Sequence, residues 1–119
     1  MHKSNSFRDK RVAELLKEEI SVIIFKEVKD PRVKNISITD VVVSKDFSVA
    51  KVYFRTFIKE DLENCLTGLN KSAGFIKSRL VKNIRLKHIP NLEFFYDDTL
   101  DNALKIEALI KEVSSDINE

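Results

Sequence analysis

The sequence predicts a single α+β domain with elements in the order α-β-β-α-α-β-α. Apolar residues recur at helical spacing near the start, in the middle and near the end of the chain. Three segments between them are β-branched or alternate apolar with polar residues. A length of 119 residues corresponds to one domain. The 43% hydrophobic content suits one core. The chain has only two Gly and two Pro, which excludes collagen-like and low-complexity proteins.

The first predicted element is a helix that ends before Asp30-Pro31, because proline disfavours the helical conformation in the residue before it. Its apolar residues recur at steps of three, four and one, which places them on one stripe. They are Val12, Leu15, Leu16, Ile20, Ile23 and Ile24.

Two strands follow, at 36–43 and 49–57. The first is a β-branched run. In the second, Ala50, Val52 and Phe54 alternate with polar or amphipathic residues, so one face is expected to be buried. The short polar connection at 44–48 predicts an antiparallel hairpin.

A second helical region begins at about Lys59 and carries two apolar stripes. The first stripe is Leu62, Cys65, Leu66 and Leu69, and the second is Ile76, Leu80 and Ile84. Ser72-Ala73-Gly74 lies between them. Because Gly weakens a helix by about 1 kcal/mol relative to Ala, we expect a kink or break there. Cys65 lies on the apolar side, where a buried, unreactive side chain is expected.

The chain is predicted to end with a strand and a helix. After Pro90, Leu92, Phe94 and Tyr96 alternate along the third strand. Asp98 can cap the last helix. The apolar side of that helix is formed by Leu100, Ala103, Leu104, Ile106, Leu109, Ile110 and Val113. We expect residues 7–113 to be ordered, with a frayed tail from Ser114.

Several functional classes have little support in the sequence. One cysteine cannot form an internal disulfide, no apolar run approaches the ~20 residues that span a bilayer, and no signal peptide is recognisable. His2 and His88 are the only histidines, and no metal-binding or phosphate-loop motif occurs. We therefore expect a cytoplasmic, non-enzymatic protein without metal, cofactor, membrane or small-molecule substrate. Asp97-Asp98 is interpreted as a strand end leading into a capped helix rather than an acid/base pair.

Charge is distributed unevenly along the chain. No acid occurs between Glu63 and Glu93, whereas eight acids and two bases follow from Glu93 onward. The acid-free window contains Lys71, Lys77, Arg79, Lys82, Arg85 and Lys87. Of these, Arg79, Lys82 and Arg85, together with Ser78, are expected to turn away from the apolar stripe. This block favours a polyanionic partner, although a solvated helix face is the alternative.

A second basic cluster, Arg8, Lys10 and Arg11, could extend a nucleic-acid footprint, or it could be a solvated chain end. Aromatic side chains could stack on bases if exposed. Phe75, Phe94 and Phe95 are instead expected in the core. The acidic end should lie away from the basic helix, since otherwise the two charges would cancel.

An ordered set of motifs closely resembles the bacterial ribosome-binding factor A family. The motifs are RVA at 11–13, VKDPR at 28–32, VSKDFSVAKVY at 43–53, LNKSAGFIK at 69–77, RLKHIPNLEF at 85–94, YDDT at 96–99 and the stretch 106–110. The resemblance covers about residues 7–113. It implies a KH-like fold of the second type, with a three-stranded sheet and a helix-kink-helix. Where KH domains carry a GxxG loop, the family has Ala-x-Gly, matched here by Ser72, Ala73 and Gly74.

The resemblance implies binding to the free 30S subunit and its 16S rRNA during late maturation, with roles in 5′-end processing and in the cold. The predicted rRNA contacts are the two basic clusters together with Ser72, Ala73, Gly74 and Ser78, on a monomer. Three alternatives remain open: a general KH-type regulator that binds single-stranded RNA, a small α+β enzyme, and a module that binds only proteins.

Overall fold

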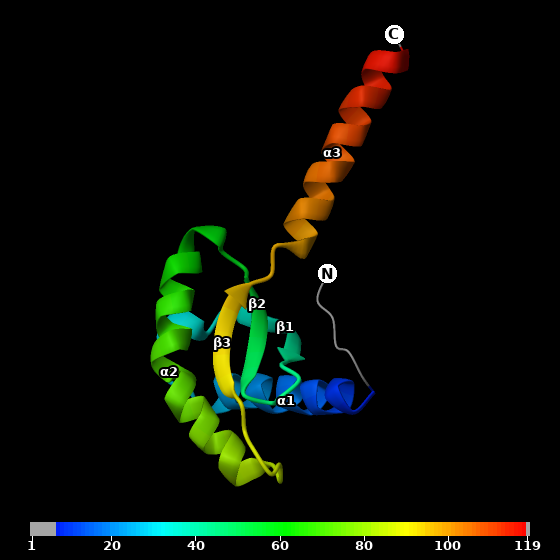
Figure 1. Ribbon diagram of the computed structural model, residues 1–119. Helices are drawn as coiled ribbons and strands as arrows, with labels where there is room; N and C mark the ends of the chain where they lie inside the picture. Colours follow the sequence, from blue (N-terminus) through cyan, green and yellow to red (C-terminus); the bar gives the residue numbers. More distant parts are fainter. Residues whose placement is uncertain (1–6, 119) are drawn as a thin grey trace.

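A three-stranded sheet covered on one face by two helices forms the body of the protein (Figure 1). The computed structural model describes residues 7–118, with side chains described for 8–113. The helices are α1 (Phe7–Lys26), α2 (Leu62–Asn83) and α3 (Thr99–Asn118), and the strands are β1 (Ile36–Val43), β2 (Val49–Thr56) and β3 (Asn91–Tyr96). Short 3-10 helices, η1 (Pro31–Val33) and η2 (Lys59–Asp61), precede β1 and α2.

The sheet has the strand order β1-β2-β3. β1 and β2 form the predicted antiparallel hairpin, with a register shift between Ile38 and Asp40. β3 runs parallel to β2, from the pair Val49–Asn91 to the pair Phe54–Tyr96. Parallel neighbours need a crossover, and α2 supplies it.

The core lies between the sheet and the two helices. Ala50, Val52 and Phe54 on β2 are fully buried, as their alternation predicts. From α1, the buried side chains include Leu16, Ile20 and Ile23. α1 packs mainly on β1, and α2 packs mainly on β3. The side of each helix opposite its buried stripe therefore faces solvent.

Of the kink or break expected at Ser72-Ala73-Gly74, the break is wrong, because α2 is one continuous helix of 22 residues. Figure 1 shows this helix curving along its length rather than dividing in two. Gly74 has no positive φ and is exposed. Both apolar stripes of α2 pack into the same core. Packing of this kind outweighs the weak helix propensity of a single glycine.

α3 projects from the end of the sheet (Figure 1), so the molecule is 62 Å long but only 18 Å thick. The helix continues to Asn118, beyond the expected fraying point. The large side chains that carry its apolar side are all more than half exposed: Leu100, Leu104, Ile106, Leu109, Ile110 and Val113. An apolar stripe indicates that a face can be buried, but it does not specify a partner. The carboxylate of Asp97, rather than that of Asp98, accepts a hydrogen bond from the first helical amide, Thr99 N, at 3.0 Å.

Candidate nucleic-acid interface

The outer face of α2 presents a stripe of polar and basic side chains. Leu69, Ile76 and Leu80 are fully buried and fix which side of the helix meets the core. Lys71, Ser78 and Lys82 are exposed. Their spacing of seven and four residues places them one above another on the opposite side. We call these three residues the α2 outer stripe. Arg85 and Lys87, both outside the buried core, continue the positive charge past the end of the helix.

Lys77 and Arg79, which the sequence assigns to the same surface, lie on the two flanks of α2. Lys77 Nζ donates to Asn91 Oδ1 at 2.7 Å, at the start of β3. Arg79 Nε pairs at 3.2 Å with Oε1 of Glu27, the residue that follows α1. A partly exposed ion pair such as Arg79–Glu27 contributes only about 0–1 kcal/mol, so a phosphate could replace it at little cost.

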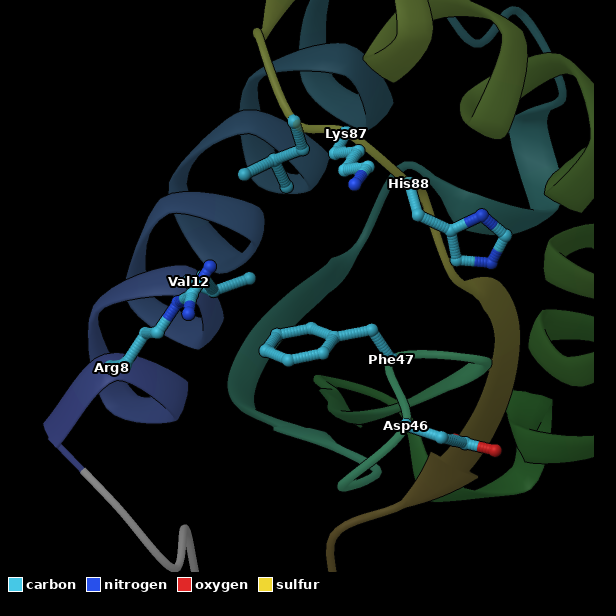
Figure 2. Close-up of a pocket in the computed structure, with 7 residues that line it drawn as sticks. Arg8, Val12, Asp46, Phe47, Lys87 and His88 are labelled. Atoms are coloured by element: carbon cyan, nitrogen blue, oxygen red, sulfur yellow. The ribbon is translucent and has the colours of Figure 1, made fainter.

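The predicted N-terminal basic cluster is only partly joined to the end of α2. Arg8 of α1 and Lys87 line one hollow of about 380 Å³, together with Val12, Leu86, His88 and the hairpin residues Asp46 and Phe47 (Figure 2). Lys10 and Arg11 are exposed on the first turns of α1, outside the lining of this hollow. The fold therefore brings Arg8 and Lys87 to the same hollow, although they are far apart in the sequence.

A second hollow contains basic residues that sequence reasoning missed. It lies between the end of α1 and the middle of α2, and is lined by Lys26, Glu27, Val28, Lys29, Phe75 and Arg79. Phe75 is 39% exposed, so its assignment to the core is wrong. Its ring lies 5.1 Å from the Arg79 guanidinium carbon. Lys29 belongs to the VKDPR motif, which together with Arg79 and Phe75 could have indicated this site.

Of the other two aromatic residues assigned to the core, one is buried and the other is exposed. Phe94 is buried as expected, whereas Phe95 is 40% exposed on the uncovered face of the sheet. There it packs beside Tyr53, with ring centroids 5.7 Å apart. Successive residues of a strand face opposite sides, which explains why these two neighbours differ.

The VKDPR motif has a structural role in the fold. Asp30 accepts hydrogen bonds from Arg32 N, Nε and Nη2, at distances from 2.6 to 3.1 Å. These bonds, with the nearby charge of Lys71 as the smallest contribution, lower the pKa of Asp30 to about 2. The turn packs against Gly68 of α2: a Cβ at that position would lie 2.9 Å from Val33 Cγ1.

The acidic C-terminal segment lies away from the basic end of α2, as expected. α2 and α3 are attached at opposite ends of β3, and Figure 1 shows α3 directed away from the sheet. Asp101 is held at the base of α3 by Arg55 (3.2 Å) and by the Tyr96 hydroxyl (3.0 Å). These hydrogen bonds lower the pKa of Asp101.

Residues considered for catalysis are engaged in structural contacts. Asp97 Oδ2 accepts from Thr39 Oγ1 at 2.6 Å, and Ser44 Oγ donates to Asp46 at 2.8 Å in the hairpin turn. Cys65 is buried. Across the described part of the chain, no group of three or more His, Cys, Asp or Glu could hold a metal ion, and no helix is long and apolar enough to cross a membrane.

Comparison with known sequences points to one family. A family model described as ribosome-binding factor A matches residues 8–110. Ribosome-binding factor A of Staphylococcus epidermidis is 43% identical over 110 residues, covering 92% of this chain and 95% of that protein. The Thermodesulfovibrio yellowstonii protein of the same name is 39% identical over 112 residues, covering 94% and 95%.

Solved structures agree with the sequence matches and confirm the α+β fold. The crystal structure of ribosome-binding factor A from Thermus thermophilus superposes with a TM-score of 0.68 at 28% identity, over 74% of this chain and 93% of that chain. A Thermus thermophilus ribosome-binding factor A homology model, fitted into a cryo-EM map of a 30S complex, gives 0.58 at 28% identity, over 79% and 96%.

Proposed function

The chain belongs to the ribosome-binding factor A family, and on this premise we propose that it binds the 30S ribosomal subunit as a non-enzymatic assembly factor. The observation that carries the proposal is the exposed α2 outer stripe, extended by Arg85, Lys87 and Arg8. Additional support comes from the Thermus thermophilus relative, whose structure was fitted into a map of a 30S complex.

The proposed contact is electrostatic and follows the shape of the RNA. Lys71 and Lys82 project from a rigid helix and can neutralise phosphates of 16S rRNA, releasing condensed counterions. Ser78 lies between them on the stripe, and its small side chain allows the RNA backbone to approach the helix. Binding of this type falls steeply with salt, by a slope of about 0.7–0.9 per phosphate contact on a log–log plot.

We further propose that the protein acts late in subunit maturation, during 5′-end processing of the rRNA, with its greatest importance in the cold. These steps rest on the family resemblance. A cytoplasmic monomer suits the role, because the partner is the free subunit.

The test is co-sedimentation with free 30S subunits, 50S subunits and intact ribosomes at two salt concentrations. The variant Lys71→Glu/Lys82→Glu reverses the charge of the α2 outer stripe. The matched control, Lys105→Glu/Lys111→Glu, makes the same net charge change on exposed positions of α3. We expect the first variant to lose 30S binding and the control to retain it. Equal loss in both variants would mean that net charge, rather than this surface, determines binding, and absence of 30S binding by the unaltered protein would refute the proposal.

A further inference from the structure

The hollow at the hairpin turn has the composition of a small-ligand site. Three separate parts of the fold form it: the first turns of α1, the turn between β1 and β2, and the connection between α2 and β3. Its volume of about 380 Å³ lies within the ~300–1,000 Å³ range of small-molecule sites. Val12, Phe47 and Leu86 provide apolar surface, and Arg8 and Lys87 provide positive charge at the same place.

Phe47 has an unusual backbone. With φ of 60° it is the one non-glycine residue in the described chain that adopts a positive φ. A bulky aromatic is disfavoured in this region, where Gly, Asn or Asp would be expected. Strained backbone of this kind persists where the surroundings hold it, and it concentrates at ligand sites.

The turn that carries Phe47 is held by a network of hydrogen bonds. Phe47 N donates to Ser44 O at 2.9 Å, and Val49 N donates to Ser44 Oγ at 3.1 Å. Asp46 Oδ1 accepts from Ser44 Oγ, Ser48 N and Ser48 Oγ, at 2.8, 3.1 and 2.7 Å. These bonds fix the backbone of the turn, and the half-buried Phe47 side chain also packs against the core, with part of its surface lining the hollow. The ring is therefore held in place before a ligand binds, which reduces the entropy lost when a ligand stacks on it.

Figure 2 shows how the side chains around the hollow are directed. The Phe47 ring points from the turn toward α1, into the space bordered by Arg8, Val12 and Lys87. The Asp46 carboxylate points the other way. Its hydrogen bonds from Ser48 and Ser44 lower its pKa to about 2, so it is ionised and committed to its own turn. The ring and the two cations therefore face a common space, and Asp46 lines its edge with its carboxylate hydrogen-bonded to its own turn.

We propose that this hollow binds one unpaired nucleotide of the RNA, with the base against the Phe47 ring and the phosphate on Arg8 and Lys87. The inference rests on the proposed function and names the RNA element that this site recognises. Aromatic rings bind splayed bases by stacking, and lysine and arginine bind the adjoining phosphate. A base within a duplex is already stacked on both faces and cannot enter, so the site selects single-stranded RNA beside the α2 outer stripe.

The experiment is an amide NMR titration of the full chain with defined probes. Adenosine 5′-monophosphate, adenosine and inorganic phosphate are added separately, followed by a tetra-adenylate and by a duplex RNA. We expect the nucleotide and the tetra-adenylate to shift amides near Arg8, Phe47 and Lys87, and adenosine and phosphate to do so less. A response to the free nucleotide but not to the tetra-adenylate would assign the site to free nucleotides and overturn the RNA inference.

Variants separate stacking from folding. Phe47→Leu keeps apolar volume but removes the ring, and should weaken tetra-adenylate binding by at least about five-fold, whereas Phe47→Tyr should retain it. Arg8→Gln/Lys87→Gln should also lose binding, and Lys105→Gln/Lys111→Gln, which removes two positive charges from exposed positions of α3, is the matched control. Melting temperatures establish that each variant is folded.

Two outcomes distinguish this inference from the proposed function. If Phe47→Leu binds tetra-adenylate as tightly as the unaltered protein, or if the shifts map only to the α2 outer stripe, the nucleotide site is refuted while 30S co-sedimentation is unaffected. If the unaltered protein does not sediment with 30S subunits, the proposed function fails, whatever the titration shows.

Discussion

The two glycines of α2 are predicted to respond in opposite directions to the same substitution. A Cβ added at Gly68 would lie 2.9 Å from Val33 Cγ1, 3.1 Å from Arg32 Cβ and 3.3 Å from Asp30 Oδ2. At Gly74 it would meet no heavy atom within 4 Å. Each position therefore serves as the control for the other within one helix.

The magnitudes follow from helix propensity and packing. Alanine is favoured over glycine by about 1 kcal/mol in a helix interior, so Gly74→Ala should stabilise the protein by about 0.5–1 kcal/mol. At Gly68 the same gain is opposed by overpacking, which costs about 1–3 kcal/mol. Val33 is 1% exposed, and Asp30 and Arg32 are fixed by their mutual hydrogen bonds, so the neighbours cannot move aside easily. Gly68→Ala should give a net loss of about 1–2 kcal/mol.

Urea denaturation followed by circular dichroism measures the change in the free energy of unfolding for each variant. A change of 1 kcal/mol corresponds to roughly 4 °C in melting temperature, and the two melting temperatures should move in opposite directions. A destabilised Gly74→Ala variant would show that this position needs glycine, contrary to the open space around it. A Gly68→Ala variant at least as stable as the unaltered protein would refute the close packing of η1 against α2.

Three further predictions concern α3 and the turn that precedes β1. Truncation after Asn102 removes an exposed helix and should change the melting temperature by less than about 2 °C; a large loss would mean that α3 packs on the domain. Arg32→Ala should raise the pKa of Asp30 from about 2 toward 3.8 in a carboxyl NMR titration, although the bond from the amide of residue 32 remains. The variant therefore loses part of a stabilisation that is present above the unfolded pKa and lost as pH falls toward 2. An unshifted pKa would contradict the assigned hydrogen bonds. Glu107→Gln/Glu112→Gln removes two negative charges that repel phosphate, so the protein's affinity for random RNA should increase in low-salt filter binding. The increase should be smaller at physiological salt, where charges are screened over about 8 Å. Unchanged low-salt affinity would exclude steering by α3.

Local patterns of apolar residues were sufficient to predict most helices and strands in the body of the fold. β2 alternates because one face meets the helices, and α1 carries one stripe because one side meets the sheet. The continuity of α2 was not predictable from Gly74, since helix propensity is a local quantity and the packing that overrides it is not. The partner of the α3 stripe was not predictable either, because periodicity reports a face and not what covers it.

The sequence indicated which basic residues belong to the candidate site, but it did not indicate how the fold arranges them. Ser78, Lys82 and Arg85, which the sequence expected to turn away from the apolar stripe, are exposed, and the structure adds Lys71 to the same side of α2. The separation of Lys77 and Arg79 onto two flanks depends on contacts with β3 and with Glu27, just after α1, that are distant in sequence. The hollow at the hairpin turn likewise joins segments brought together only by the fold.

The central claim, that the α2 outer stripe faces 16S rRNA, can be tested by tethered hydroxyl-radical probing. Cys65 is the chain's one cysteine and is buried, so a cysteine introduced at an exposed position is the reactive thiol. An iron chelate is attached to Ser78→Cys on α2 or to Glu107→Cys on α3, and each protein is bound to free 30S subunits. We predict strong rRNA cleavage from position 78 and little from position 107. Cleavage from position 107 with none from position 78, in subunits that retain both proteins, would contradict the proposed orientation.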